Sequence, residues 1–166
     1  TGPVGARLVS EERIELDPET NPDFEELSDM IKYANKSCVT VITDAGNGSG
    51  VVIRNDGLVL TAFHVVDNIN RIEVQFSEGL TLEAELVSYD EVSDVALLDI
   101  TGSGYQALPL NPKADSPLGE DVVTIGTPAD VSLGQSVAKG MISGKREKND
   151  IVVLQADIAV SPGNSG

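Results

Sequence analysis

The sequence predicts an all-β fold, and three observations support this prediction. The 166-residue chain contains 16 glycines and eight prolines, a composition that favours many turns. From Cys38 onward, short apolar runs and strictly alternating segments recur, and this period of two places one face of each strand in a core. Six such strands suit a small closed barrel, whereas the three that follow residue 120 can form a sheet but cannot close a second one.

Residues 1–37 are predicted to form an acidic leader followed by one short helix. The stretch from residue 11 to residue 29 is strongly acidic, with Arg13 as its one basic residue, which is typical of a solvated segment. A helix is expected over residues 23–35 with Asp23 as its N-cap. Its apolar positions recur at helical spacing and are Phe24, Leu27, Ile31 and Ala34. We expect this face to cover the chain's own domain.

Residues 38–101 are predicted to form the first barrel. Its strands are expected at residues 38–43, 51–54, 58–62, 71–76, 81–86 and 95–100. The glycine-rich stretch GNGSG at residues 46–50 is expected to be a turn. Asn55-Asp56-Gly57 predicts a tight hairpin, because Asp-Gly tolerates the positive φ angles of such turns.

A linker is expected over residues 102–118, which are rich in glycine, proline and polar side chains. Residues 119–166 would then form an incomplete second barrel. Its three strands are expected at residues 121–126, 135–144 and 151–156, with KREKND at 145–150 as a short link. The chain is therefore expected to hold one complete barrel and part of another.

Composition excludes several function classes. Against 27 acidic residues the chain has 11 basic ones, so it lacks the basic footprint that nucleic-acid binding requires. Cys38 is the single cysteine, which rules out an intrachain disulfide and a cysteine-based zinc site, and its apolar surroundings predict a buried side chain. No stretch approaches the ~20 apolar residues that span a bilayer. The sequence predicts neither a cofactor nor a metal site.

Three residues could together catalyse acyl transfer. His64 is the only histidine, Asp94 directly precedes an apolar strand, and Ser165 lies in a glycine-flanked turn. A serine hydroxyl becomes nucleophilic when a neutral imidazole takes its proton, and a carboxylate holds that imidazole in the required tautomer. The backbone N–H groups of Gly163 and Ser165 could bind the resulting oxyanion. Asp90 and Asp99 are less favoured carboxylates, which we expect to be solvated.

The chain resembles the trypsin-like serine proteases, and looks closest to their HtrA/Deg-type branch of bacteria and organelles. The resemblance runs from about Cys38 to the last residue. Its motifs are GSGVVI at 48–53, DGLVLTAFHVVD at 56–67, SDVALLDI at 93–100, VVTIGTP at 122–128 and QADIAVSPGNSG at 155–166. Val65 stands where digestive relatives carry a disulfide cysteine, which fits this branch.

The resemblance implies a trypsin-like double β-barrel with the active site between the barrels. It assigns His64 as general base, Asp94 as its orienting carboxylate and Ser165 as nucleophile, with Gly163 and Ser165 framing the oxyanion hole. It further implies a polypeptide substrate and an exported location, periplasmic or at the cell envelope, and it leaves a homo-oligomer open.

The sequence given stops one residue after Ser165, before the strands that close the second barrel in this family. We therefore expect a polypeptide ending at Gly166 to have little or no protease activity. The alternative function is a non-catalytic, peptide-binding or chaperone-like relative of the same fold. An esterase of the α/β-hydrolase type is disfavoured, because its serine would precede the aspartate and the histidine.

Overall fold

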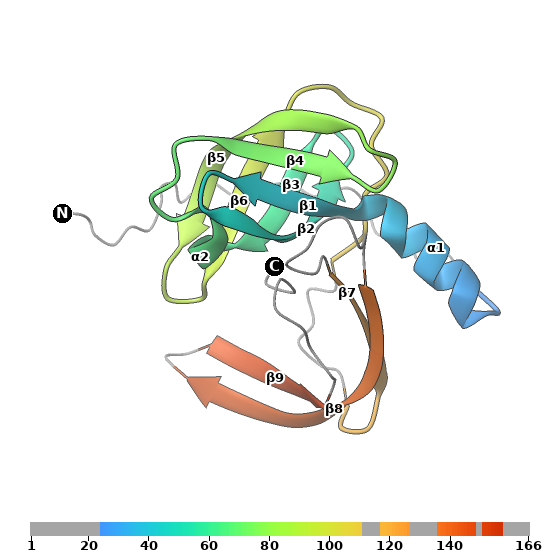
Figure 1. Ribbon diagram of the computed structural model, residues 1–166. Coiled ribbons are helices and arrows are strands. Elements are labelled where there is room, and N and C mark those ends of the chain that lie inside the picture. The colour runs from blue at the N-terminus through green and yellow to red at the C-terminus, as the bar shows by residue number, and fades with distance from the viewer. Residues whose placement is uncertain (1–23, 111–116, 127–135, 149–150, 158–166) are drawn as a thin grey trace.

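The computed structural model describes residues 24–110, 117–126, 136–148 and 151–157 (Figure 1). Within them lie one projecting helix, a closed barrel and a separate three-stranded sheet. The all-β prediction is confirmed. No helix among the described residues is long and apolar enough to cross a membrane.

Six antiparallel strands close into the barrel, in the order β1-β2-β3-β6-β5-β4. They are β1 (Cys38–Thr43), β2 (Gly46–Arg54), β3 (Leu58–Ala62), β4 (Ile72–Phe76), β5 (Thr81–Asp90) and β6 (Val95–Ile100). β1 pairs with both β2 and β4, which closes the ring. In the closed ring each barrel strand has a paired neighbour on both sides, so none of the six is an edge strand.

Alternate strand residues fill the barrel interior. Val41 pairs with Val74 across β1 and β4, and Val59 pairs with Leu98 across β3 and β6. All four side chains are completely buried. Branched aliphatic side chains suit this position because they pack well on a pleated surface. The period-two pattern in the sequence therefore indicates the core correctly.

The glycine-rich stretch GNGSG is not a turn, contrary to the sequence-based prediction. It forms the first half of β2 and pairs with β1 from Gly46 to Gly50. The turn lies instead at residues 44–45. A Cβ atom at Gly50 would stand 3.1 Å from both the Leu60 carbonyl oxygen and a Val41 methyl carbon. The strand needs a residue without a side chain there because neighbouring groups approach closely.

The predicted hairpin at Asn55-Asp56-Gly57 is confirmed. Gly57 has a φ angle of 102° and begins the return into β3. Its carbonyl oxygen accepts a 3.0 Å hydrogen bond from the Ile100 backbone N–H, which ties the turn to the end of β6.

Helix α1 spans Leu27–Ser37 and begins four residues later than predicted. Its N-cap position is occupied by Glu26, while Asp23 lies outside the described residues. The helix projects from the start of β1 away from the barrel (Figure 1), and only Ser37 is buried. Leu27 remains 44% exposed. The predicted covering of the domain by the apolar face fails at Leu27, whereas Ile31 and Ala34 are half-buried.

The end of α1 is tied to the segment that follows the barrel. Gln106 Nε2 donates hydrogen bonds of 2.5 Å to the Tyr33 carbonyl oxygen and 3.1 Å to Ser37 Oγ. Ser37 Oγ in turn donates a 2.8 Å bond to the Gln106 carbonyl oxygen. The same segment lies alongside β2, since Leu108 N–H donates to the Val52 carbonyl oxygen at 2.9 Å. The predicted linker therefore begins as a segment bound to the barrel wall.

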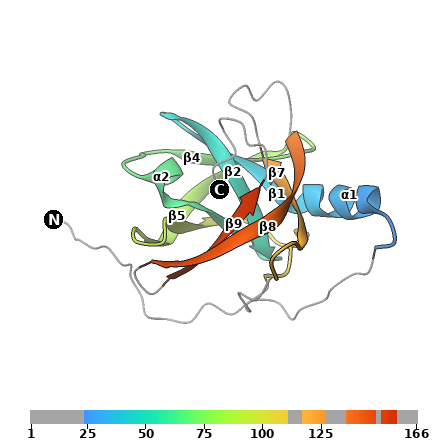
Figure 2. The same cartoon turned by 90° about the horizontal axis from the view of Figure 1, so that it is seen from below.

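The second sheet contains β7 (Asp121–Gly126), β8 (Ser136–Lys148) and β9 (Ile151–Asp157), antiparallel and in that order. Figure 2 shows β8 running as one long strand. The predicted link at 145–150 is thus wrong for residues 145–148, which pair with β9. β7 contacts β1 and β2, so the sheet approaches the barrel at these strands. The exact domain boundaries stay a prediction.

Candidate active site

His64 follows β3 on a one-turn helix, α2 (Phe63–Val66), which sequence reasoning did not predict. Phe63 and Val66 are buried, whereas the His64 side chain is 56% exposed. Apolar residues on either side of His64 therefore fix the short helix to the barrel, and the imidazole stays on its outer side.

Asp94 lies in the turn from β5 to β6 with an unusual backbone. Its φ angle is +57°, in the left-handed region, where aspartate is more frequent than most residues with a Cβ atom. The turn is built by two further contacts. Val92 N–H donates to Asp90 Oδ1 at 3.0 Å, and Asp94 N–H donates to the Glu91 carbonyl oxygen at 3.3 Å. Asp90, expected to be solvated, thus shapes the turn.

Strand pairing brings His64 and Asp94 together although they lie 30 residues apart. Ala62 at the end of β3 pairs with Val95 at the start of β6. Phe63 and His64, which follow Ala62, therefore lie beside Asp94, which precedes Val95. Phe63 N–H donates to the Asp94 carbonyl oxygen at 3.1 Å, which fixes the two segments at this crossing.

The Asp94 carboxylate makes two contacts with His64. Oδ1 accepts the backbone N–H of His64 at 2.8 Å, and Oδ2 lies 2.6 Å from the imidazole Nδ1. An ionised carboxylate can only accept hydrogen bonds, so Nδ1 must carry the proton in this contact. The neutral ring then has its lone pair on Nε2. The imidazole is set as a base whose free nitrogen points away from Asp94.

The contact between His64 and Asp94 matters more for the orientation of the imidazole than for the stability of the fold. The side chains of His64 and Asp94 are 56% and 47% exposed. Water screens an exposed ion pair strongly, so a net contribution of at most about 1 kcal/mol to folding is expected. The two-point contact nonetheless fixes the tautomer and the orientation of the ring.

The other predicted site residues, Ser165 and Gly163, lie outside the described residues. The structure thus brings together two of the three residues predicted to form the triad. Among the described residues there is no group of three or more histidine, cysteine, aspartate or glutamate side chains that could hold a metal ion. Burial raises the pKa of the Cys38 thiol to about 11, so this side chain stays protonated at neutral pH.

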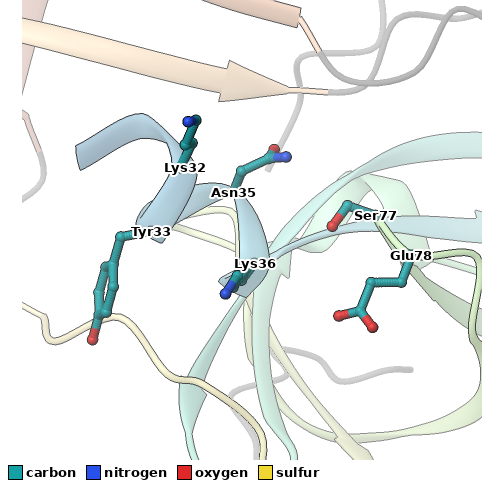
Figure 3. Close-up of a pocket in the computed structure, with 6 residues that line it drawn as sticks. All are labelled: Lys32, Tyr33, Asn35, Lys36, Ser77 and Glu78. Carbon is teal, nitrogen blue, oxygen red and sulfur yellow. The ribbon is translucent and has the colours of Figure 1, made fainter. Parts of the chain in front are cut away.

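A separate hollow of about 730 Å³ lies between α1 and the turn from β4 to β5 (Figure 3). It is lined by Lys32, Tyr33, Asn35, Lys36, Ser77 and Glu78. Neither His64 nor Asp94 lines it, so this hollow is distinct from the histidine–aspartate pair.

Comparisons with known proteins agree with the fold. Residues 48–166 match the family model of the trypsin-like peptidase domain. The chain is 41% identical over 123 residues to a probable periplasmic serine endoprotease DegP-like of Pseudomonas putida strain F1, covering 72% of this chain and 25% of that protein. It is 37% identical over 125 residues to the serine endoprotease DegS of Haemophilus influenzae, covering 72% of this chain and 36% of that protein.

A vertebrate relative and a solved structure extend the comparison. The serine protease HTRA1 of Xenopus tropicalis is 38% identical over 131 residues, which cover 74% of this chain and 28% of that protein. The crystal structure of the serine endoprotease from Yersinia pestis superposes with a TM-score of 0.75 at 31% identity, covering 87% of this chain and 53% of that one. The chain thus spans between a quarter and about a third of the length of these curated relatives.

Proposed function

The chain belongs to the family of trypsin-like peptidase domains, of the HtrA/Deg type, and on this premise we propose that it is a serine endopeptidase. The observation that supports this most strongly is the two-point contact of Asp94 with His64. It orients the imidazole with Nδ1 toward Asp94, so that the neutral ring presents an unprotonated Nε2, which is what a general base requires.

In the proposed reaction, Nε2 of His64 takes the proton of Ser165 Oγ while that oxygen attacks a peptide carbonyl carbon. The resulting imidazolium is stabilised by Asp94, which stays ionised. His64 then gives the proton to the leaving amine, and the C–N bond breaks to leave an acyl-enzyme. Water, deprotonated by His64 in turn, attacks the ester carbonyl carbon, and His64 returns the proton to Ser165 Oγ as the ester C–O bond breaks and the acid leaves.

The negative charge on the carbonyl oxygen requires fixed donors. We assign this role to the backbone N–H groups of Gly163 and Ser165. Removal of one such donor typically costs about 3–4 kcal/mol of transition-state stabilisation. The proposed machinery is made of protein groups alone, so no cofactor is required.

The substrate is proposed to be a polypeptide, in keeping with the endoprotease names of the relatives. The Pseudomonas relative is described as periplasmic, and we propose an exported location for this protein as well.

The function is tested by comparing the full-length protein with its Ser165→Ala variant on casein and on a fluorogenic peptide. Turnover is expected in the first protein and about 10³-fold or greater loss in the second. Equal turnover in both would refute the proposal. No turnover in either, with retained peptide binding, would instead identify a non-catalytic peptide-binding relative.

A polypeptide that ends at Gly166 is a separate case. The three strands β7–β9 form a sheet rather than a closed barrel in the described part of the chain. We expect such a polypeptide to react with a fluorophosphonate probe far more slowly than a longer one. Stoichiometric labelling of the shorter form would contradict this expectation.

A further inference from the structure

Two aromatic rings stack directly beside the histidine. Phe63, the residue before His64, lies against Tyr89 of β5 with ring centroids 4.4 Å apart and planes only 10° from parallel. Both pack against the barrel core, and Phe63 is 8% exposed. Nothing in the proposed chemistry assigns a role to this pair.

The strand register explains how Tyr89 reaches Phe63. Tyr89 of β5 pairs with Ala96 of β6, which pairs with Thr61 of β3. Directly paired residues of antiparallel strands point to the same face of the sheet. Ala96 is completely buried, so Tyr89 also faces the barrel interior, at the end of the barrel from which α2 emerges. The small side chain of Ala96 leaves room for the two rings.

Helix α2 depends on such support. Its four residues form a single turn, and a turn of this length is not stable by itself. The His64 side chain is about half exposed, so few side-chain contacts hold it in place. Its orientation depends instead on its neighbours, and Phe63 carries both a ring contact to Tyr89 and a backbone hydrogen bond to Asp94.

We propose that Tyr89 is a positioning residue, whose ring supports Phe63 and thereby keeps His64 in the orientation that meets both carboxylate oxygens of Asp94. The catalytic part of this inference rests on the proposed function. The geometric part concerns the His64–Asp94 contact alone and can be measured without any turnover.

The test uses Tyr89→Leu, which removes the ring, and Tyr89→Phe, which keeps it and removes the hydroxyl. Tyr105→Leu is the matched control. Tyr105 also stacks on a phenylalanine of the barrel, Phe76, with centroids 5.4 Å apart. Its backbone N–H bonds to Asn55, at the opposite end of β3 from His64, so this variant loses a comparable stack far from the site.

The first readout is the nuclear magnetic resonance spectrum of the imidazole. His64 is the only histidine in the sequence, so its ring signals are unambiguous. In Tyr89→Leu we expect loss of the hydrogen-bonded Nδ1 proton signal. Tyr89→Phe and Tyr105→Leu should both keep the native signal.

The second readout is peptide hydrolysis by the full-length protein. The interaction energy of a stacked aromatic pair corresponds to about a tenfold change in a rate constant. We therefore expect kcat to fall about tenfold in Tyr89→Leu, with KM changed by less than about twofold. Tyr89→Phe should restore kcat. Phe63→Leu removes the other ring of the same stack. It replaces Tyr89→Leu in the test if that variant does not fold.

An unchanged Nδ1 signal in a folded variant that lacks the stack would overturn the inference, whatever the turnover. Equal losses in Tyr89→Leu and Tyr105→Leu would also overturn it, because the effect would then be one of general stability. If instead the Ser165→Ala test fails, the proposed function falls while the spectrum of His64 still tests the role of Tyr89.

Discussion

Replacement of Asp94 by asparagine is the sharpest perturbation of the proposed mechanism. The asparagine oxygen can still accept the backbone N–H of His64, which Oδ1 now accepts at 2.8 Å. Its NH₂ group would then stand where Oδ2 lies, 2.6 Å from Nδ1. Two N–H donors cannot face each other at this distance, so Nδ1 must lose its proton to accept from the amide. The proton moves to Nε2, the nitrogen that would take the serine proton.

The expected loss follows from this change of tautomer. An imidazole protonated at Nε2 cannot act as the base, and in triads of this type the same change lowers kcat by about 10⁴-fold. The effect on folding should be small, because the exposed pair contributes at most about 1 kcal/mol. This corresponds to a shift of about 2–4 °C in Tm for a domain of this size. Catalysis and stability should therefore separate clearly.

The assay is steady-state hydrolysis of a fluorogenic peptide by the full-length protein, with thermal unfolding measured in parallel. Asp90→Asn is the matched control. It removes the same charge from the same turn but retains an oxygen that can accept Val92 N–H, so kcat should change less than about twofold. If Asp94→Asn retains more than about a tenth of the wild-type kcat while folded, the assignment of His64 and Asp94 as base and orienting carboxylate is refuted.

Three further predictions concern backbone strain, the pH dependence of stability and thiol reactivity. Gly57→Ala and Gly79→Ala both place a side chain at a positive φ angle, but only at Gly57 would the new Cβ lie 2.3 Å from the Ile100 carbonyl oxygen. Denaturant unfolding should therefore show a free energy of unfolding about 1–3 kcal/mol lower for Gly57→Ala than for Gly79→Ala. Equal losses in the two variants would contradict this reasoning. Burial raises the pKa of the Cys38 thiol from 9.0 to about 11, so the folded state holds this proton more tightly than the unfolded state does. The free energy of unfolding should therefore fall as the pH rises from about 9 to about 11. The Cys38→Ala variant should lack this contribution. Alkylation of Cys38 at pH 8 should be far slower in the folded chain than in denaturant, and equal rates would show that the thiol is accessible.

Strand positions could be predicted where the local pattern and the tertiary environment agree. The boundaries of β1, β3 and β6 are as expected, because each is an apolar run with a turn or a polar loop on at least one side. GNGSG was misread because its glycines signal a turn locally. At Gly50 the glycine is required by the close approach of β1 and β3, which involves residues far away in the sequence.

Two other errors have the same origin. The polar end of β8, residues 145–148, becomes a strand because it pairs with β9, and polar sequence alone does not reveal a partner. The apolar face of α1 shows helical spacing, but spacing does not specify what the face contacts, and Leu27 remains exposed.

The site could be anticipated only in part. Residue types and order pointed to His64 and Asp94, whereas their contact depends on the pairing of Ala62 with Val95. The stack of Phe63 on Tyr89 left no signal in the sequence, because it arises from a register across three strands.

The central claim is that His64, oriented by Asp94, activates Ser165. It is tested most directly by treating the full-length protein with a fluorophosphonate and locating the adduct by mass spectrometry. We predict one adduct per chain, on Ser165, absent in Ser165→Ala and formed at least about 10³-fold more slowly in His64→Ala. An adduct on another residue, or equal labelling of the wild-type and His64→Ala proteins, would contradict the claim.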